Sequence, residues 1–138
     1  MSIAVAHSDT PEGRAALLAA SAWAETHDTD LLVLHVEGDT ASETTRPEAR
    51  QSGVHEVERA VTDTFQQHGA HPVDWSVVAT PSGGDVASAL LDLVVEHAAE
   101  LLVVGSQRRS RVGKLLMGST VQRVVLDSPV PVLVVRAG

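Results

Sequence analysis

A stretch rich in glycine and arginine near the carboxyl end of the chain combines residue types that bind anions. Gly105 directly follows an apolar run, and a glycine lets the backbone turn sharply or approach a ligand closely. Gly118 precedes Ser119 and Thr120, where a helix is predicted to begin, and helix-start N–H groups and hydroxyls attract phosphate. Four of the ten basic residues lie within residues 108–114. The pattern indicates a phosphate cradle, or else a capped helix beside a solvated basic loop.

The distribution of charge sets this stretch apart from the rest of the chain. The net charge is −8, yet residues 101–138 carry six basic residues against one acid, Asp127. Nucleic acid and anionic membranes are poor partners for so acidic a chain, because they too are negatively charged. One concentrated basic segment therefore indicates a local anion site. The absence of cysteine excludes disulfide bonds, a thiolate metal site and a cysteine nucleophile.

Catalysis and metal binding find little support in the sequence. Neither a Gly-x-Ser-x-Gly nucleophile elbow nor a Gly-x4-Gly-Lys-Ser/Thr phosphate loop occurs. The histidine pair His68 and His71 lies at a predicted helix end without cysteine nearby, so we expect no metal site. Asp9, Glu12 and Asp39 are expected at the ligand-binding edge, where such carboxylates either hold Mg²⁺ against phosphates or are simply solvated. We therefore expect a binding protein and not an enzyme.

Apolar runs and amphipathic repeats alternate along the chain. Strands are predicted over residues 2–7, 30–36, 73–79, 100–104 and 131–136. Helices are predicted between them, with Thr10 and Asp85 as N-caps, Gly69 as a C-cap and residues 119–127 as the last, short helix. The polar stretch 37–51 is expected to be a loop.

Strands that are apolar on both faces and alternate with helices predict a single α/β domain over residues 1–138. Its core would be an open parallel five-stranded sheet with helices on both faces. In such sheets ligands bind at the carboxyl ends of the strands, near the switch in strand order, which here places residues 7–11, 36–39, 80–84 and 105–118 at one edge. No signal peptide or membrane helix is visible, so we expect a soluble, cytoplasmic protein.

The chain resembles the universal stress proteins. That family carries a Gly-x2-Gly-x9-Gly-Ser/Thr loop after the fourth strand, then a short helix and a Pro-x-Pro-Val-Leu-Val-Val type last strand. This sequence is similar at Gly105, at Gly118-Ser119, at Pro129–Val135 and at the helix start Thr10–Leu17. The resemblance implies a Rossmann-like sheet of the adenine nucleotide alpha hydrolase type, with strand order 3-2-1-4-5.

The same resemblance implies an adenine nucleotide, ATP or AMP, as ligand, with Mg²⁺ as a companion of ATP. Carried over position by position, the binding residues are Val5, His7, Val36, Gly105, Arg108, Gly118, Ser119 and Thr120. Two of them depart from the family, because Arg108 replaces the second loop glycine and His7 replaces an aspartate. We interpret Arg108 as a phosphate contact, since its guanidinium fork suits phosphate oxygens. The alternative is that Arg108 blocks the loop conformation, since a residue other than glycine resists positive φ.

The resemblance also implies a homodimer, and a terminal apolar strand at a sheet edge invites pairing through that last strand. The expected role is a regulatory one in stress response, exerted on an unknown client protein. The alternative is a dimeric interaction module of the same fold that binds no nucleotide.

Overall fold

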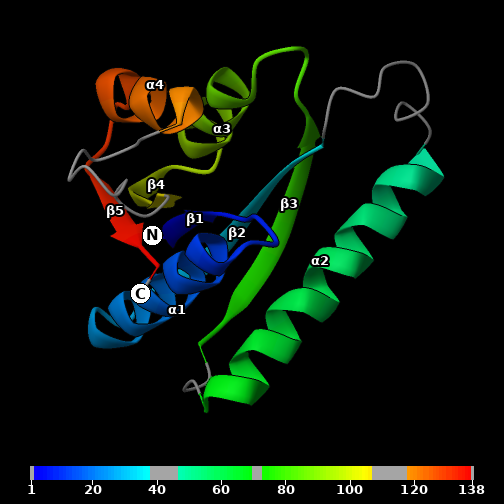
Figure 1. The fold of residues 1–138 in the computed structure, drawn as a ribbon, viewed down its shortest axis with the longest axis vertical. Helices are drawn as coiled ribbons and strands as arrows, with labels where there is room; N and C mark the ends of the chain where they lie inside the picture. Colours follow the sequence, from blue (N-terminus) through cyan, green and yellow to red (C-terminus); the bar gives the residue numbers. More distant parts are fainter. Residues whose placement is uncertain (1, 38–46, 70–72, 107–117, 138) are drawn as a thin grey trace, which may run out of the picture.

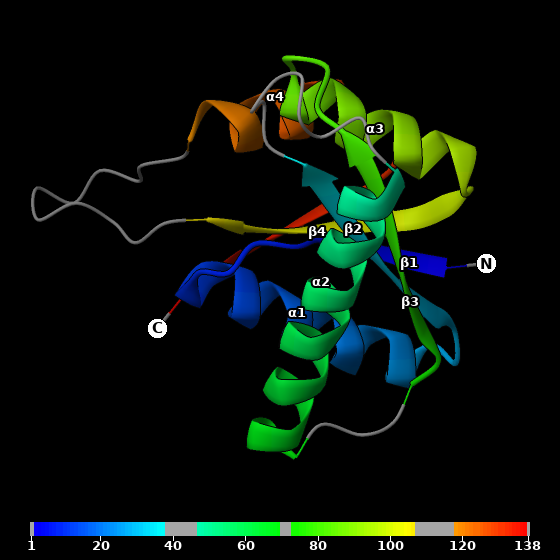
Figure 2. The same cartoon turned by 90° about the vertical axis from the view of Figure 1, so that its right-hand side faces the viewer.

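Five parallel strands form one sheet in the order β3-β2-β1-β4-β5, between two layers of helices (Figures 1 and 2). The computed structural model describes residues 2–37, 47–69, 73–106 and 118–137. The strands are β1 (Ser2–Ala6), β2 (Asp30–Glu37), β3 (Trp75–Pro81), β4 (Ala99–Ser106) and β5 (Val132–Arg136). The helices are α1 (Pro11–Thr26), α2 (Pro47–His68), α3 (Val86–Glu96) and α4 (Ser119–Asp127). The predicted fold class and strand order are thus confirmed.

Alternation of side chains along the central strands builds a separate core on each face of the sheet. The face covered by α1 and α2 takes the odd positions of β1 and β4, among them Ile3, Val5 and Val103, all fully buried. The opposite face takes the even positions, such as Ala4 and Leu102, and packs against α3 and α4. Figure 2 shows these two helical layers on either side of the sheet. Helices therefore cover both faces of the sheet, and sheets of this kind bind ligands at the ends of their strands.

Local signals fix where the helices begin. Thr10 caps α1 by accepting a hydrogen bond from the Gly13 N–H at 3.0 Å, and Pro11 is the first helical residue, as predicted. Asp85 caps α3 in the same way, through the N–H of Ser88 at 3.2 Å. Gly69 follows α2 with a φ of +59°, which confirms it as the predicted left-handed C-cap. None of the described helices is long and apolar enough to cross a membrane.

Three predicted boundaries are wrong, each for a reason that lies outside the local pattern. The helix α2 begins at Pro47, inside the predicted loop, and proline suits a first helical position. The prediction missed this start because the apolar repeat of the helix begins only at residue 54. The edge strand β3 runs on to Pro81, where proline is tolerated. The strand β4 includes Gly105 and Ser106, because β5 pairs with both of them.

Candidate functional site

The switch in strand order lies between β1 and β4, at the centre of the sheet. The chain leaves β1 towards α1 on one face, whereas it leaves β4 towards α4 on the other face (Figure 1). In parallel α/β sheets, a crevice for ligands lies at this position, outside the carboxyl ends of the two strands. His7 follows β1 at this edge, and Ser106 is the last residue of β4.

The start of α4 offers backbone donors at this edge. Gly118 is its N-cap, with φ −63° and ψ 157° and no side-chain cap, and the next two residues, Ser119 and Thr120, begin the helix. Gly118 and Ser119 are exposed and Thr120 is half-buried. First-turn N–H groups without a side-chain partner are free for an anion, and the helix dipole favours one. The three predicted residues are therefore brought together at one helix end.

Ser106 is a buried polar group that the sequence analysis did not single out. Its side chain is 1% exposed, and its Oγ has no hydrogen-bond partner among the described residues. A buried hydroxyl without a partner is costly, so it needs an explanation such as a bound group. The signal in the sequence is a serine that follows the apolar run of β4 and the neighbouring Gly105.

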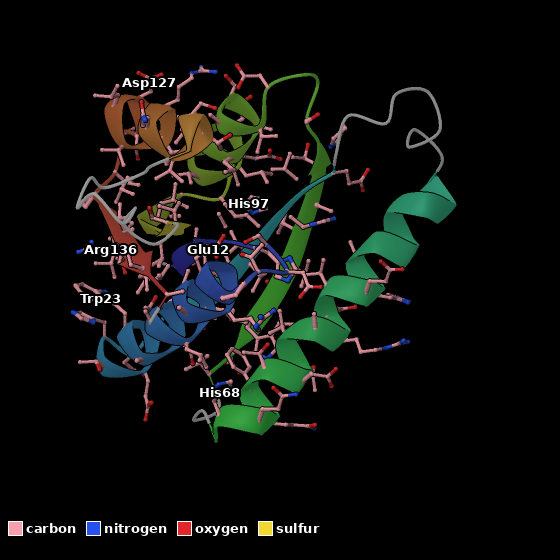
Figure 3. All side chains as sticks on the ribbon, in the orientation of Figure 1. Glu12, Trp23, His68, His97, Asp127 and Arg136 are labelled. Carbon is pink, nitrogen blue, oxygen red and sulfur yellow. The ribbon has the colours of Figure 1, made fainter. Side chains whose placement is uncertain are left out.

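Gly105 serves packing and does not turn the chain, which corrects that part of the prediction, whereas its approach to a ligand stays a prediction. It lies inside β4, paired with Val135. A Cβ at Gly105 would overlap the carbonyl oxygen of Glu12 and stand 2.6 Å from its carbonyl carbon. Figure 3 shows Glu12 at the start of α1. The missing side chain thus lets the first turn of α1 lie directly against β4.

The loop between β1 and α1 is held in a compact form by its own polar groups. The hydroxyls of Ser8 and Thr10 are hydrogen-bonded at 2.8 Å, and Asp9 forms an ion pair with Arg14 at 3.2 Å. Gly13 lies so close to Ser8 that a Cβ there would overlap its backbone and hydroxyl oxygens. The loop therefore fixes the position of His7 relative to α1.

His7 and His35 meet at the ends of neighbouring strands. Their ring centroids lie 6.0 Å apart and the ring planes make an angle of 71°, an edge-to-face contact. Burial lowers the pKa of His7 below its ordinary value, and the charge of a protonated His35 lowers it further. Burial also lowers the pKa of His35, against the opposing influence of Glu37 and Glu56. Both rings are therefore held as neutral imidazoles at neutral pH.

The remaining predicted binding residues lie in different surroundings. Val5 is fully buried in the core under α1, so its side chain cannot reach a ligand at the edge. Val36 is partly buried near the end of β2 and packs on the face of α3 and α4. Arg108 lies outside the described residues, and its role as a phosphate contact stays a prediction.

A cavity of about 460 Å³ opens beside His7, between α1 and α2. Its walls carry charged and polar side chains together with small ones, and the lining residues are His7, Ser8, Asp9, Gly13, Arg14, Leu17, Ala60, Asp63, Thr64 and Gln67. It lies on the face opposite α4, and its lining includes no described residue of β4 or α4.

An ion pair fastens α4 to the start of α3. Arg123 donates to Asp85 at 2.6 Å and to the Ser88 hydroxyl at 3.3 Å, and its Nε lies 3.9 Å from Asp127. The hydrogen bond from Arg123 is the main reason why the pKa of Asp85 falls to about 2. Since Val124 is the only buried residue of α4, this pair contributes to the placement of its first turn.

Metal ligands do not converge in the part of the chain that the structure describes: no group of three or more histidine, aspartate or glutamate side chains could hold an ion there. Asp9, one of the carboxylates predicted at the edge, is engaged by Arg14.

The strand order, with its switch between β1 and β4, defines a doubly wound α/β domain. The sequence model of the universal stress protein family matches residues 1–136. A universal stress protein of Mycolicibacterium smegmatis is 38% identical over 134 residues, which are 97% of this chain and 96% of that relative. The chain belongs to the universal stress protein family.

Solved structures of the same family share the fold. A universal stress protein from Archaeoglobus fulgidus superposes with a TM-score of 0.76 at 23% identity, covering 98% of both chains. Two others were solved as complexes. One, from Archaeoglobus fulgidus, is a complex with dAMP; it superposes with a TM-score of 0.70 at 19% identity and covers 98% of this chain and 97% of its own. The other is a complex with cAMP; its TM-score is 0.70 at 22% identity, and the match covers 100% of this chain and 98% of its own.

Proposed function

We propose that this protein binds an adenine nucleotide in the crevice between β1 and β4, and that it acts in stress response through this binding and not through turnover. The phosphates would lie on the first turn of α4, at Gly118, Ser119 and Thr120. The base and ribose would lie towards the ends of β1 and β2, near His7 and Val36. ATP, accompanied by Mg²⁺, and AMP are both candidate ligands.

The single observation that carries the proposal is that two sets of hydrogen-bond donors near the switch point have no side-chain partner among the described residues. The first turn of α4 has no side-chain cap, and the buried Oγ of Ser106 has no partner in the described part of the chain. Both are donors, and donors left open at one edge are what a phosphate or a ribose satisfies. The dAMP and cAMP bound by two structural neighbours support an adenine nucleotide as the class of ligand.

Calorimetric titration with AMP, cAMP and ATP plus Mg²⁺ tests the proposal. Ser106→Ala removes the unpartnered hydroxyl, and we expect it to weaken binding about tenfold, the size of one hydrogen bond to a charged group. The folded protein without ligand should be no less stable, because a buried unsatisfied hydroxyl contributes nothing favourable. Ser21→Ala is the matched control, since Ser21 is also a buried serine (3% exposed) but lies on α1.

The outcomes separate the two functions. Binding that Ser106→Ala leaves unchanged would place the ligand elsewhere. Failure of all three nucleotides to bind would refute the proposal and favour the interaction module without nucleotide.

We also propose a homodimer formed through β5. This strand is one edge of the sheet, hydrogen-bonded to β4 alone (Figure 1). The preceding helix exposes two apolar side chains, Val125 at 43% and Leu126 at 80%. An apolar edge of this kind invites pairing with a second copy, and a client protein would then bind the assembled dimer.

A further inference from the structure

His7 and His35 lie where protonation of either ring would change the contact between them. His7 and His35 lie on the face of α1 and α2, with 6.0 Å between ring centroids. The His7 backbone is fixed, because its N–H donates to the Leu34 carbonyl at 2.8 Å. The backbone of α2 covers His35, since a Cβ on Gly53 would stand 3.9 Å from the His35 Nε2. Both rings are therefore confined, and neither is fully exposed.

Charged groups face the two rings unequally. His7 faces Asp9 of its own loop, and it shares its cavity with Arg14 of α1 and Asp63 of α2. Asp9 is already paired with Arg14. His35 faces two carboxylates, Glu37 on its own strand and Glu56 on α2. A proton is therefore better accommodated on His35 than on His7.

Glu37 provides an acceptor that the neutral state does not use. Its side chain is 9% exposed, and its Oε1 has no hydrogen-bond partner among the described residues. It is two positions after His35, so both side chains emerge on the same face of β2. A protonated imidazole donates from both nitrogens, and a bond to a carboxylate is among the strong ones.

We propose that His35 is a proton-operated switch: the neutral ring packs edge-to-face on His7, and the protonated ring leaves His7 and donates to the buried carboxylate of Glu37. His7 then loses the partner that holds its ring at the end of β1. The coupling of this switch to ligand affinity rests on the proposed function, because only a nucleotide lying near His7 would sense it.

The direction in which nucleotide affinity changes with pH follows from the titration of His7 and His35. Burial lowers the pKa of both rings, so protonation occurs below the ordinary histidine value of about 6.5. The first proton opposes a second one on the neighbouring ring, so the pair titrates in two coupled steps. A nucleotide that binds the neutral arrangement better releases a proton on binding, and its affinity therefore falls as the pH is lowered.

Histidine side-chain NMR on the whole protein without nucleotide tests the switch itself. We expect His35→Gln to raise the pKa of His7, because a neighbouring cation is removed. We expect Glu37→Gln to lower the pKa of His35, because its acceptor loses its charge. His97→Gln is the control, since His97 is an exposed C-cap of α3 and should change neither value. Unchanged pKa values in both test variants would overturn the proposal.

Calorimetry with cAMP then tests the coupling. A phosphodiester keeps its charge across this pH range, whereas the AMP phosphate titrates near pH 6. Between pH 7.5 and 5.5 we expect the affinity of the unmodified protein to fall about five- to tenfold, and that of His35→Gln to change less than about twofold. An equal pH dependence in both proteins would refute the coupling. Absence of cAMP binding at pH 7.5 would refute cAMP as the ligand and the coupling with it, while the NMR titration would still decide the switch.

Discussion

Gly105→Ala should destabilise the fold because the space for a methyl group is taken by the backbone of α1. The new Cβ would stand 2.6 Å from the Glu12 carbonyl carbon and 3.1 Å from the Gly13 nitrogen. Ordinary contact requires about 3.4 Å, so the first turn of α1 would have to move away from β4. The helix cannot yield easily, because Ala16 and Leu17 are buried in the core that it shares with β4.

The expected cost is that of an overpacked core, about 1–3 kcal/mol. For a chain of this size each kcal/mol lowers the melting temperature by about 3–4 °C. Urea unfolding followed by circular dichroism measures the loss, with an unchanged m-value as the sign that the folded state alone is affected.

Gly118→Ser is the matched control for this prediction. Both glycines belong to the same loop motif, but a Cβ at Gly118 meets nothing within 4 Å, and its φ of −63° suits any residue. Serine is also a favourable N-cap, so we expect stability to be unchanged or about 1 kcal/mol higher. Equal stability of Gly105→Ala and the unmodified protein would refute the packing role of Gly105. A Gly118→Ser variant less stable than Gly105→Ala would also refute it.

Three further predictions concern the ligand, acid and assembly. Gly118→Val should lower the free energy of unfolding by about 1 kcal/mol or less, the loss expected for a poor N-cap residue. It should weaken AMP binding in calorimetry more than tenfold, because its side chain projects into the space assigned to phosphate, and unaltered affinity would contradict that assignment. Asp85 has a pKa of about 2 against 3.8 when free, so its contribution to stability is complete above pH 3.8 and is lost as the pH falls towards 2. Asp85→Asn should reduce the fall in melting temperature between pH 3.8 and 2, measured by thermal shift at a series of pH values. An equally steep fall in the variant would assign this loss of stability to other carboxylates. Light scattering of the unmodified protein at micromolar concentration should give the mass of a dimer, and a monomer would exclude pairing through β5.

Features encoded by neighbouring residues could be predicted from the sequence, and features made by distant ones could not. Thr10 with Pro11 indicated the start of α1, and residues 119–127 were predicted with the observed bounds of α4. The need for glycine at 105 arises from the carbonyl of Glu12, some ninety positions earlier, and no local pattern carries that information. The reading of Gly105 as a turn was therefore wrong.

The same distinction applies to the candidate site. The helix start at Gly118 was recognised from its own residues, and the structure gives it the expected place at the strand ends. The contact between His7 and His35 depends on the pairing of β1 with β2 in one register, which places Ala6 beside Leu34. Alternation along both strands would have shown that the two histidines share a face, once the strands were assumed to be neighbours.

The central place of β1 has a consequence for how the domain is made. Synthesis proceeds from the amino end, so β1, β2 and β3 can pair while the second half of the chain is still being translated. In this three-stranded intermediate β1 is an edge strand, and its free side pairs with β4 only after residues 99–106 have been synthesised. During that interval the central strand of the finished sheet is an exposed apolar edge, and such edges aggregate. We therefore expect a nascent chain that stops before β4 to aggregate more readily than the completed domain.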